Sequence, residues 1–127
     1  MNKKIIRGAI YYADLDPIVE YEKRAYKPVL IIQNDMNSKY SSTIMVAPII
    51  IKSYKGKKYP THVKVKQFNK LRHDSIISLE QIRTIDKRKI KGYVDMLNKS
   101  QMKDVEKALI LSFGFSNEYL INIIHNF

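Results

Sequence analysis

Cysteine is absent from this chain of 127 residues, and acidic side chains are scarce, with 12 Asp and Glu against 23 Lys and Arg. The lack of cysteine excludes a disulfide scaffold, thiol catalysis and thiolate metal sites. No apolar run approaches the roughly 18 residues of a membrane span, and the residues before Gly8 lack the apolar core of a signal peptide. We therefore expect a cytoplasmic protein with no membrane segment.

The composition favours one folded domain with its own core. A chain of 127 residues, 45% of them hydrophobic, can bury a core without disulfides or metals. No internal repeat, low-complexity segment or domain boundary is visible. The formal net charge of +11 suggests an anionic partner. A surplus of lysine also keeps a protein soluble without any partner, so the net charge alone leaves both interpretations open.

The positive charge is unevenly distributed. Between Asp35 and Asp74 there is no acidic residue. The cations of this stretch are Lys39, Lys52, Lys55, Lys57, Lys58, Lys64, Lys66, Lys70 and Arg72, and its aromatic residues include Tyr40, Tyr54, Tyr59 and Phe68. Cations that neutralise phosphates and rings that stack on unpaired bases are typical of a nucleic-acid-binding surface. The alternative is a solvated loop whose tyrosines belong to the core.

Hydrophobic patterning predicts several short strands followed by helix. The expected strands are residues 8–13, 28–33, 43–51, 62–66 and 75–85, with a weaker candidate at 91–97. Residues 34–38 have the composition of a turn. Strands that precede C-terminal helices indicate a mainly β fold with α, a small β-barrel with appended helices.

The helix expected over residues 99–113 has clear boundaries. Asn98 and Gln101 form a capping-box pattern, and Gly114 is placed to end the helix. The apolar residues at helical spacing are Met102, Val105, Ala108, Leu109 and Phe113. A second short helix is expected from Ser116, with Leu120, Ile123, Ile124 and Phe127 on one face. The predicted organisation is one barrel domain over residues 1–115 with a C-terminal helical extension over 116–127.

Four ordered segments resemble the MazF/PemK toxins. They are residues 7–17 (RGAIYYADLDP), 27–35 (KPVLIIQND), 60–63 (PTHV) and 79–87 (LEQIRTIDK). The resemblance implies an SH3-like barrel of the MazF/CcdB type, usually homodimeric. It also implies a metal-independent endoribonuclease (an mRNA interferase, a hydrolase) that needs no cofactor and cuts single-stranded RNA. The expected partners are RNA and an antitoxin protein that lies over the active surface.

The resemblance breaks down where the family carries its chemistry. Lys27 occupies the position of the family's catalytic arginine, and Ile50 that of its catalytic Thr or Ser. A shift of register by one residue places Ile51 there, which offers no hydroxyl either. The ammonium of lysine is a compact charge, whereas the planar guanidinium of arginine can donate two parallel hydrogen bonds to a phosphate. The side chain of isoleucine donates no hydrogen bond. Loss of one such donor typically costs about 100–1000-fold in rate, so weakened cleavage is expected.

Candidate site residues follow from the resemblance and from charge. The catalytic candidates are Lys27, Ser53 as the nearest downstream hydroxyl, and Glu22, which keeps the family's loop glutamate. The RNA-binding candidates are Lys52, Lys55, Lys57, Lys58, Tyr21, Tyr26, Gln81 and Arg83. No metal site is expected, because His62 and His73 are widely spaced and cysteine is absent.

Several of these residues also have a purely structural interpretation. Ile50 lies in an apolar run and is most simply a core residue, while Lys27 is a charge at the start of a strand. Gln81 and Arg83 are expected two apart on one strand face, where polar side chains often serve the backbone. His62 is interpreted first as structural and only second as an acid or base.

Three functions remain after the sequence alone. The first is a toxin whose cleavage of single-stranded RNA is weakened or rewired through Lys27. The second is an inactive relative that binds RNA or an antitoxin. The third is a gyrase poison of the CcdB kind, against which the four segments argue.

Overall fold

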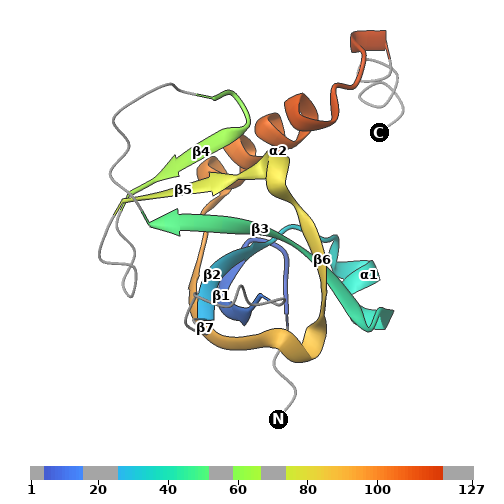
Figure 1. Cartoon of the computed structure of the whole chain (residues 1–127). Coiled ribbons are helices and arrows are strands. Elements are labelled where there is room, and N and C mark those ends of the chain that lie inside the picture. Colours follow the sequence, from blue (N-terminus) through green and yellow to red (C-terminus); the bar gives the residue numbers. More distant parts are fainter. Residues whose placement is uncertain (1–4, 16–25, 52–58, 67–73, 119–127) are drawn as a thin grey trace.

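We analysed the fold in a computed structural model that describes residues 5–15, 26–51, 59–66 and 74–118. The strands are β1 (Ala9–Asp14), β2 (Tyr26–Ile31), β3 (Thr43–Ile51), β4 (His62–Val65), β5 (Ser75–Ser78), β6 (Arg83–Asp86) and β7 (Ile90–Met96). The helices are α1 (Asp35–Tyr40) and α2 (Lys99–Phe113), with short 3-10 turns η1 (Leu79–Gln81) and η2 (Lys87–Lys89). Figure 1 shows the strands curling around one another with α2 beside them.

All strand pairs are antiparallel, in the order β4-β5-β3-β2-β1-β7, and β6 pairs with β3. The nine-residue strand β3 connects two parts of the sheet, because its first six residues pair with β2 or β6 and its last three residues pair with β5. The seven-stranded sheet does not close on itself. The prediction of a mainly β fold with a C-terminal helix is confirmed, and the architecture is barrel-like only in a loose sense.

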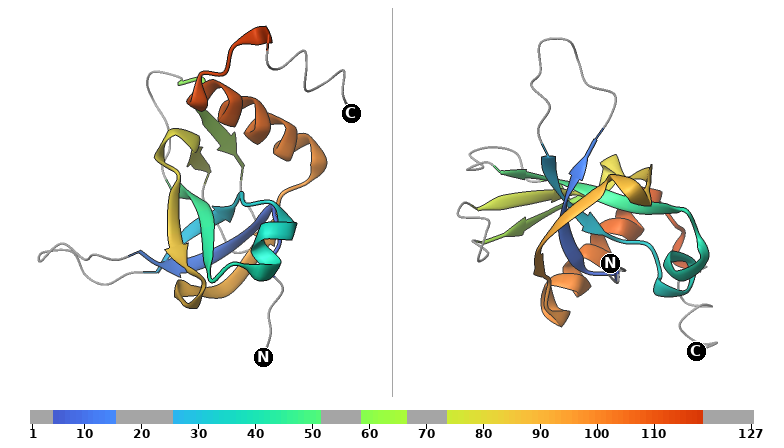
Figure 2. Two further views of the ribbon diagram at one scale, coloured as in Figure 1. Left: turned by 90° about the vertical axis from the view of Figure 1, so that its right-hand side faces the viewer. Right: turned by 90° about the horizontal axis from the view of Figure 1, so that it is seen from below.

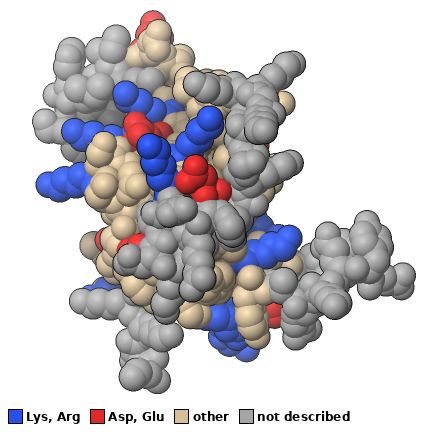
Figure 3. All heavy atoms as spheres, turned by 90° about the vertical axis from the view of Figure 1, so that its left-hand side faces the viewer, with Lys and Arg blue, Asp and Glu red and all other residues tan. Residues whose placement is uncertain are grey.

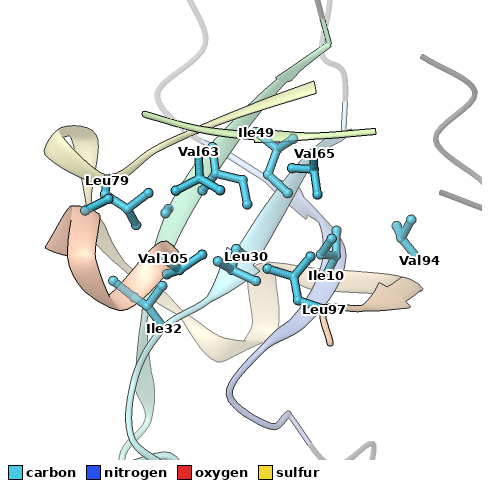
Figure 4. Packing of buried hydrophobic residues seen from close by; sticks show 13 residues of the cluster. Ile10, Leu30, Ile32, Ile49, Val63, Val65, Leu79, Val94, Leu97 and Val105 are labelled. Carbon is cyan, nitrogen blue, oxygen red and sulfur yellow. The ribbon is translucent and has the colours of Figure 1, made fainter. Parts of the chain in front are cut away.

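Two hydrophobic clusters lie on the two sides of the central strands. One, shown in Figure 4, includes Leu30, Ile49, Val63 and Val105 and is covered by α2. The other includes Val29, Ile31, Ile44, Val46 and Ile85. Adjacent residues of β2 therefore enter different clusters, which explains why this strand is a continuous apolar run in the sequence.

Helix α2 has the boundaries that the sequence predicts. The Asn98 side chain accepts a hydrogen bond from the Gln101 amide at 2.8 Å, and the Gln101 side chain accepts one from the Asn98 amide at 2.9 Å. Gly114 ends the helix in the left-handed conformation at φ 68°. Val105 and Ala108 are buried as expected. Phe113, the last residue at the same spacing, is exposed.

Two predictions are wrong in detail. The turn expected at 34–38 is the start of α1, which Asn34 caps by accepting from the Asn37 amide at 2.8 Å. The single strand expected at 75–85 is divided into β5, η1 and β6. The division has a topological reason: η1 carries the chain away from the β4–β5–β3 end of the sheet, so that β6 can pair with the first half of β3.

The proposed organisation into residues 1–115 and a helical extension over 116–127 stays a prediction, because residues 119–127 lie outside the described part of the chain. Among the described helices, none combines the length and apolar character that crossing a membrane requires.

Candidate functional site

Lys27 and Ile50 lie on the same face of the sheet. The last paired residues of β2 and β3 are Val29 and Pro48, and each strand continues two residues beyond that pair to Lys27 and Ile50. Because side chains alternate from face to face along a strand, both side chains point to the face of Val29 and Pro48. β1 and β2 then leave in one direction and β3 in another, as the right-hand view of Figure 2 shows. The two residues therefore flank the corner at which these strands part.

Ile50 is not a core residue. Its side chain is 41% exposed, although the neighbouring Ile49 is buried at 4%. The structural interpretation of Ile50 as core is therefore wrong. The adjacent residues Val46 and Ala47 are both buried where β2 pairs with β3, whereas Ile50 lies past the last residue that pairs with β2. Lys27 is exposed as well, and it pairs with Ala13 of β1.

A row of side chains extends from Ile50 across the neighbouring strands. Ile50 pairs with Ile76 of β5, and Ile76 pairs with Lys64 of β4. Directly paired residues share a face, so Lys64 lies on the same side of the sheet as Ile50. Lys64 and Lys66 are both exposed. Figure 3 shows Lys and Arg atoms gathered on the side where β3 and β4 end and β5 begins, with a few acidic atoms among them.

His62 lies at the start of β4 in a fixed environment. Its Nε2 is 3.0 Å from Glu80 Oε2, its Nδ1 is buried, and its ring packs against Tyr59 with the ring centroids 4.9 Å apart. Burial raises the pKa of Glu80. Four effects lower it: hydrogen bonds from the Glu80 backbone, from His62 and from Thr61, and the charge of His62. Together they outweigh burial, so the pKa of Glu80 is lowered overall. This geometry agrees with a structural role for His62, since neither ring nitrogen is presented to a substrate.

Gln81 and Arg83 do not lie on one strand face. Gln81 ends η1, whereas Arg83 begins β6 opposite Val46, so the expectation of a shared strand is wrong. Both side chains are exposed. Tyr26 is 54% exposed at the start of β2. It is adjacent to Lys27, so it points to the opposite face of that strand.

The part of the chain from residue 6 to residue 113 matches the model of a family described as PemK-like, MazF-like toxin of type II toxin-antitoxin system. The chain belongs to this family. A relative named Endoribonuclease MazF from Staphylococcus epidermidis is 46% identical over 114 residues, which cover 89% of this chain and 94% of the relative. The family predicted from the four sequence segments is confirmed.

Solved structures of other proteins have the same fold. The Mycobacterium tuberculosis toxin MazF-mt6 superposes with a TM-score of 0.70 at 24% identity, over 85% of this chain and 98% of the toxin. An endoribonuclease in complex with its cognate antitoxin from a mycobacterial species gives 0.70 at 20% identity, over 88% and 97%. A MazE–MazF structure from Deinococcus radiodurans gives 0.68 at 16% identity, over 91% and 100%.

The described residues account for only some of the predicted site of this PemK/MazF-like protein. Lys27, Tyr26, Gln81 and Arg83 have the positions given above. Seven further candidates lie outside the described residues: Glu22, Ser53, Tyr21, Lys52, Lys55, Lys57 and Lys58. Their catalytic or RNA-binding roles stay predictions. No group of three His, Cys, Asp or Glu side chains suited to a metal occurs among the residues that are described.

Two of the described cations of the acid-free stretch, Lys39 and Lys64, lie on different parts of the molecule. Lys39 lies on α1, where its Nζ is 5.5 Å from the centroid of the Tyr40 ring. Helix α1 lies on the side of the molecule away from β4, which carries Lys64 (Figure 1). The sequence pattern therefore did not distinguish Lys39 from the cations near β4 in this PemK/MazF-like fold. It also missed the exposure of Ile50 and the contact of His62 with Glu80, because both depend on pairing between distant strands.

Proposed function

We propose that this PemK/MazF-like toxin binds single-stranded RNA and cleaves it without a metal, at a rate reduced by Lys27 and Ile50. The observation that supports this proposal is the shared face of those two residues at the corner between β2 and β3. They stand where the resemblance expects the catalytic Arg and Thr or Ser. The relative from Staphylococcus epidermidis carries the name of an endoribonuclease.

The chemistry that each side chain can supply explains the expected loss of rate. Metal-free cleavage uses the ribose 2′-OH as nucleophile, so a base must take its proton and an acid must protonate the leaving 5′-oxygen. The charge on the phosphoryl oxygens also has to be stabilised. Lys27 supplies one positive charge, but not the bidentate grip of a guanidinium. Ile50 supplies neither a donor nor an acceptor.

A second function is favoured by the same residue. Because the exposed side chain of Ile50 has no polar group, the second proposed function is that of an inactive relative, which binds RNA or an antitoxin but does not cleave RNA. The two functions differ in a single observable, which is the appearance of new RNA ends.

Purified protein incubated with a mixed RNA pool in EDTA separates these functions. Mapping of new 5′ ends is expected to show slow cleavage that disappears in Lys27→Ala and persists in the matched variant Lys39→Ala on α1. If no ends appear while salt-sensitive RNA binding is intact, the inactive relative is correct. Cleavage that survives in Lys27→Ala would show that the reaction does not depend on this residue.

The proposed partners are an antitoxin protein and a second copy of the chain, acting in the cytoplasm. Support for an antitoxin comes from family membership and from related structures that contain one. Sedimentation equilibrium of the purified chain is expected to give twice the monomer mass. A monomer across the accessible concentration range would contradict the homodimer.

A further inference from the structure

Ile50 is an exposed apolar side chain in a setting of positive charge. Its paired neighbour Ile76 is buried at 4%, while Ile50 itself is 41% exposed. Lys64 lies beyond Ile76 in the same row, and Lys27 lies on the same face toward β2. No acidic residue belongs to this row. Ile50 is therefore the exposed apolar side chain of this row, with Lys64 beyond the buried Ile76 on one side and Lys27 on the other.

We propose that Ile50 packs against the base or ribose of a bound nucleotide, and that Lys27 and Lys64 pair with phosphates on either side. The occupant is single-stranded RNA, so this inference rests on the RNA binding proposed above. It assigns Ile50 a binding role at the position from which a catalytic hydroxyl is missing.

The spacing and the chemistry of the row support this assignment. Neighbouring strands are about 4.8 Å apart, so the backbones at Ile50 and Lys64 are separated by roughly 10 Å across β5. The flexible lysine stem can reach inward or outward over this distance. Every nucleobase has an apolar face, which makes such packing tolerant of sequence. In double-stranded RNA the base faces are stacked inside the helix, which selects single strands.

A binding experiment that separates bases from phosphates tests the proposal. The probe is a short labelled single-stranded RNA with 2′-O-methyl groups, which prevent attack by the 2′-oxygen during the measurement. Polyphosphate serves as the second probe, because it carries the charge without bases. Ile50→Ser is expected to weaken RNA binding about fivefold, as removal of a partly exposed side chain from an apolar contact should.

The polyphosphate results give the matched contrast. Ile50→Ser should leave polyphosphate binding unchanged, whereas Lys64→Gln should weaken the binding of both probes. Leu111→Ser on α2, where the leucine is 57% exposed, is the control for removal of an exposed apolar residue and should change neither. Ile50→Leu should keep wild-type affinity. Thermal unfolding checks each variant, and Ile50→Thr replaces Ile50→Ser if the serine variant does not fold.

Each outcome has a definite meaning. Unchanged RNA binding in Ile50→Ser, or equal losses for RNA and polyphosphate, would overturn the role of Ile50 and leave the proposed RNA binding intact. A wild-type protein that binds neither RNA nor its 2′-O-methyl form would overturn the proposed function as well.

Discussion

In the function proposed above, Lys27 and Ile50 are the residues that limit RNA cleavage. Both are exposed on one face, so their side chains are available to a ligand. The ammonium of Lys27 can hold a phosphate, but these two positions carry neither the guanidinium nor the hydroxyl that the resemblance expects. Binding and cleavage can therefore separate in this protein, since charge serves the first and directed donors serve the second.

Restoring both groups is expected to raise cleavage. The double variant Lys27→Arg with Ile50→Thr regains a bidentate phosphate ligand and a hydroxyl, and each such group is worth about 100-fold or more in rate. Single-turnover cleavage of an RNA pool in EDTA measures the effect. Lys39→Arg with Leu111→Thr is the matched control. A double variant that folds normally but stays inert would show that these positions are wrongly assigned.

Glu80 is expected to make stability depend on pH in the acid range. Its pKa in the folded protein is below the ordinary value of 4.5, so between the two values the unfolded state binds more protons and stability rises with pH. The contribution of Glu80 to stability is fully present above about pH 4.5, and it is lost as the pH falls through the lowered pKa that Glu80 has in the folded protein. For a partly exposed pair it amounts to about 0.5 kcal/mol.

Urea unfolding as a function of pH tests this expectation. Glu80→Gln should reduce stability at neutral pH and make its decline below pH about 4.5 shallower. Some decline should persist, because hydrogen bonds from Arg88 hold the pKa of Asp86 at about 2. The exposed Glu118→Gln serves as the control. Parallel stability curves for Glu80→Gln and the wild type would contradict the role of the His62–Glu80 pair.

At the scale of elements, polar side chains fix how strands and helices join. The buried Gln33 accepts from the Met45 amide at 3.2 Å and donates to Thr43 O and Ser38 Oγ, each at 3.4 Å. Arg7 donates to Ile32 O at 3.1 Å and to Glu106 of α2 at 3.0 Å. Arg7 and Gln33 lie in two of the four segments that resemble the family, residues 7–17 and 27–35. These two residues therefore have a structural role that does not depend on RNA.

The stability of helix α2 should be sensitive to its N-cap residue, Asn98. Asn98→Ala removes the hydrogen bond that the Asn98 side chain accepts from the Gln101 amide, so the free energy of unfolding should fall by about 1 kcal/mol. Denaturant unfolding measures the change, with Ser100→Ala in the exposed first turn as the control. Equal stability of Asn98→Ala and the wild type would mean that packing of Val105 and Ala108 alone determines the start of the helix.

At the scale of the whole molecule, the arrangement of charge matters more than its sum. The net charge is +11, yet cations lie both on the face of β4 and on the outside of α2. Only the first group lies near Lys27 and Ile50. RNA affinity should therefore depend on some lysines far more than on others.

The salt dependence of RNA binding tests that expectation. Lys64→Gln with Lys66→Gln should reduce the steepness of log affinity against log salt by about 0.7 for each phosphate that these lysines neutralise in the wild type. Lys103→Gln with Lys107→Gln, which removes the same charge from α2, should leave the slope nearly unchanged. Equal slopes for the two double variants would show that RNA senses only the net charge.

The sequence by itself determined the family, the mainly β fold with its C-terminal helix, and the boundaries of α2. These features depend on ordered local patterns, and a capping box involves residues only three apart. Tertiary structure alone decided that Ile50 is exposed, that it shares a face with Lys27, and that His62 contacts Glu80. It also divided the stretch 75–85 and separated Lys39 from Lys64. Each of these depends on pairing between strands that are distant in the chain, and an apolar run does not reveal where its covering neighbours end.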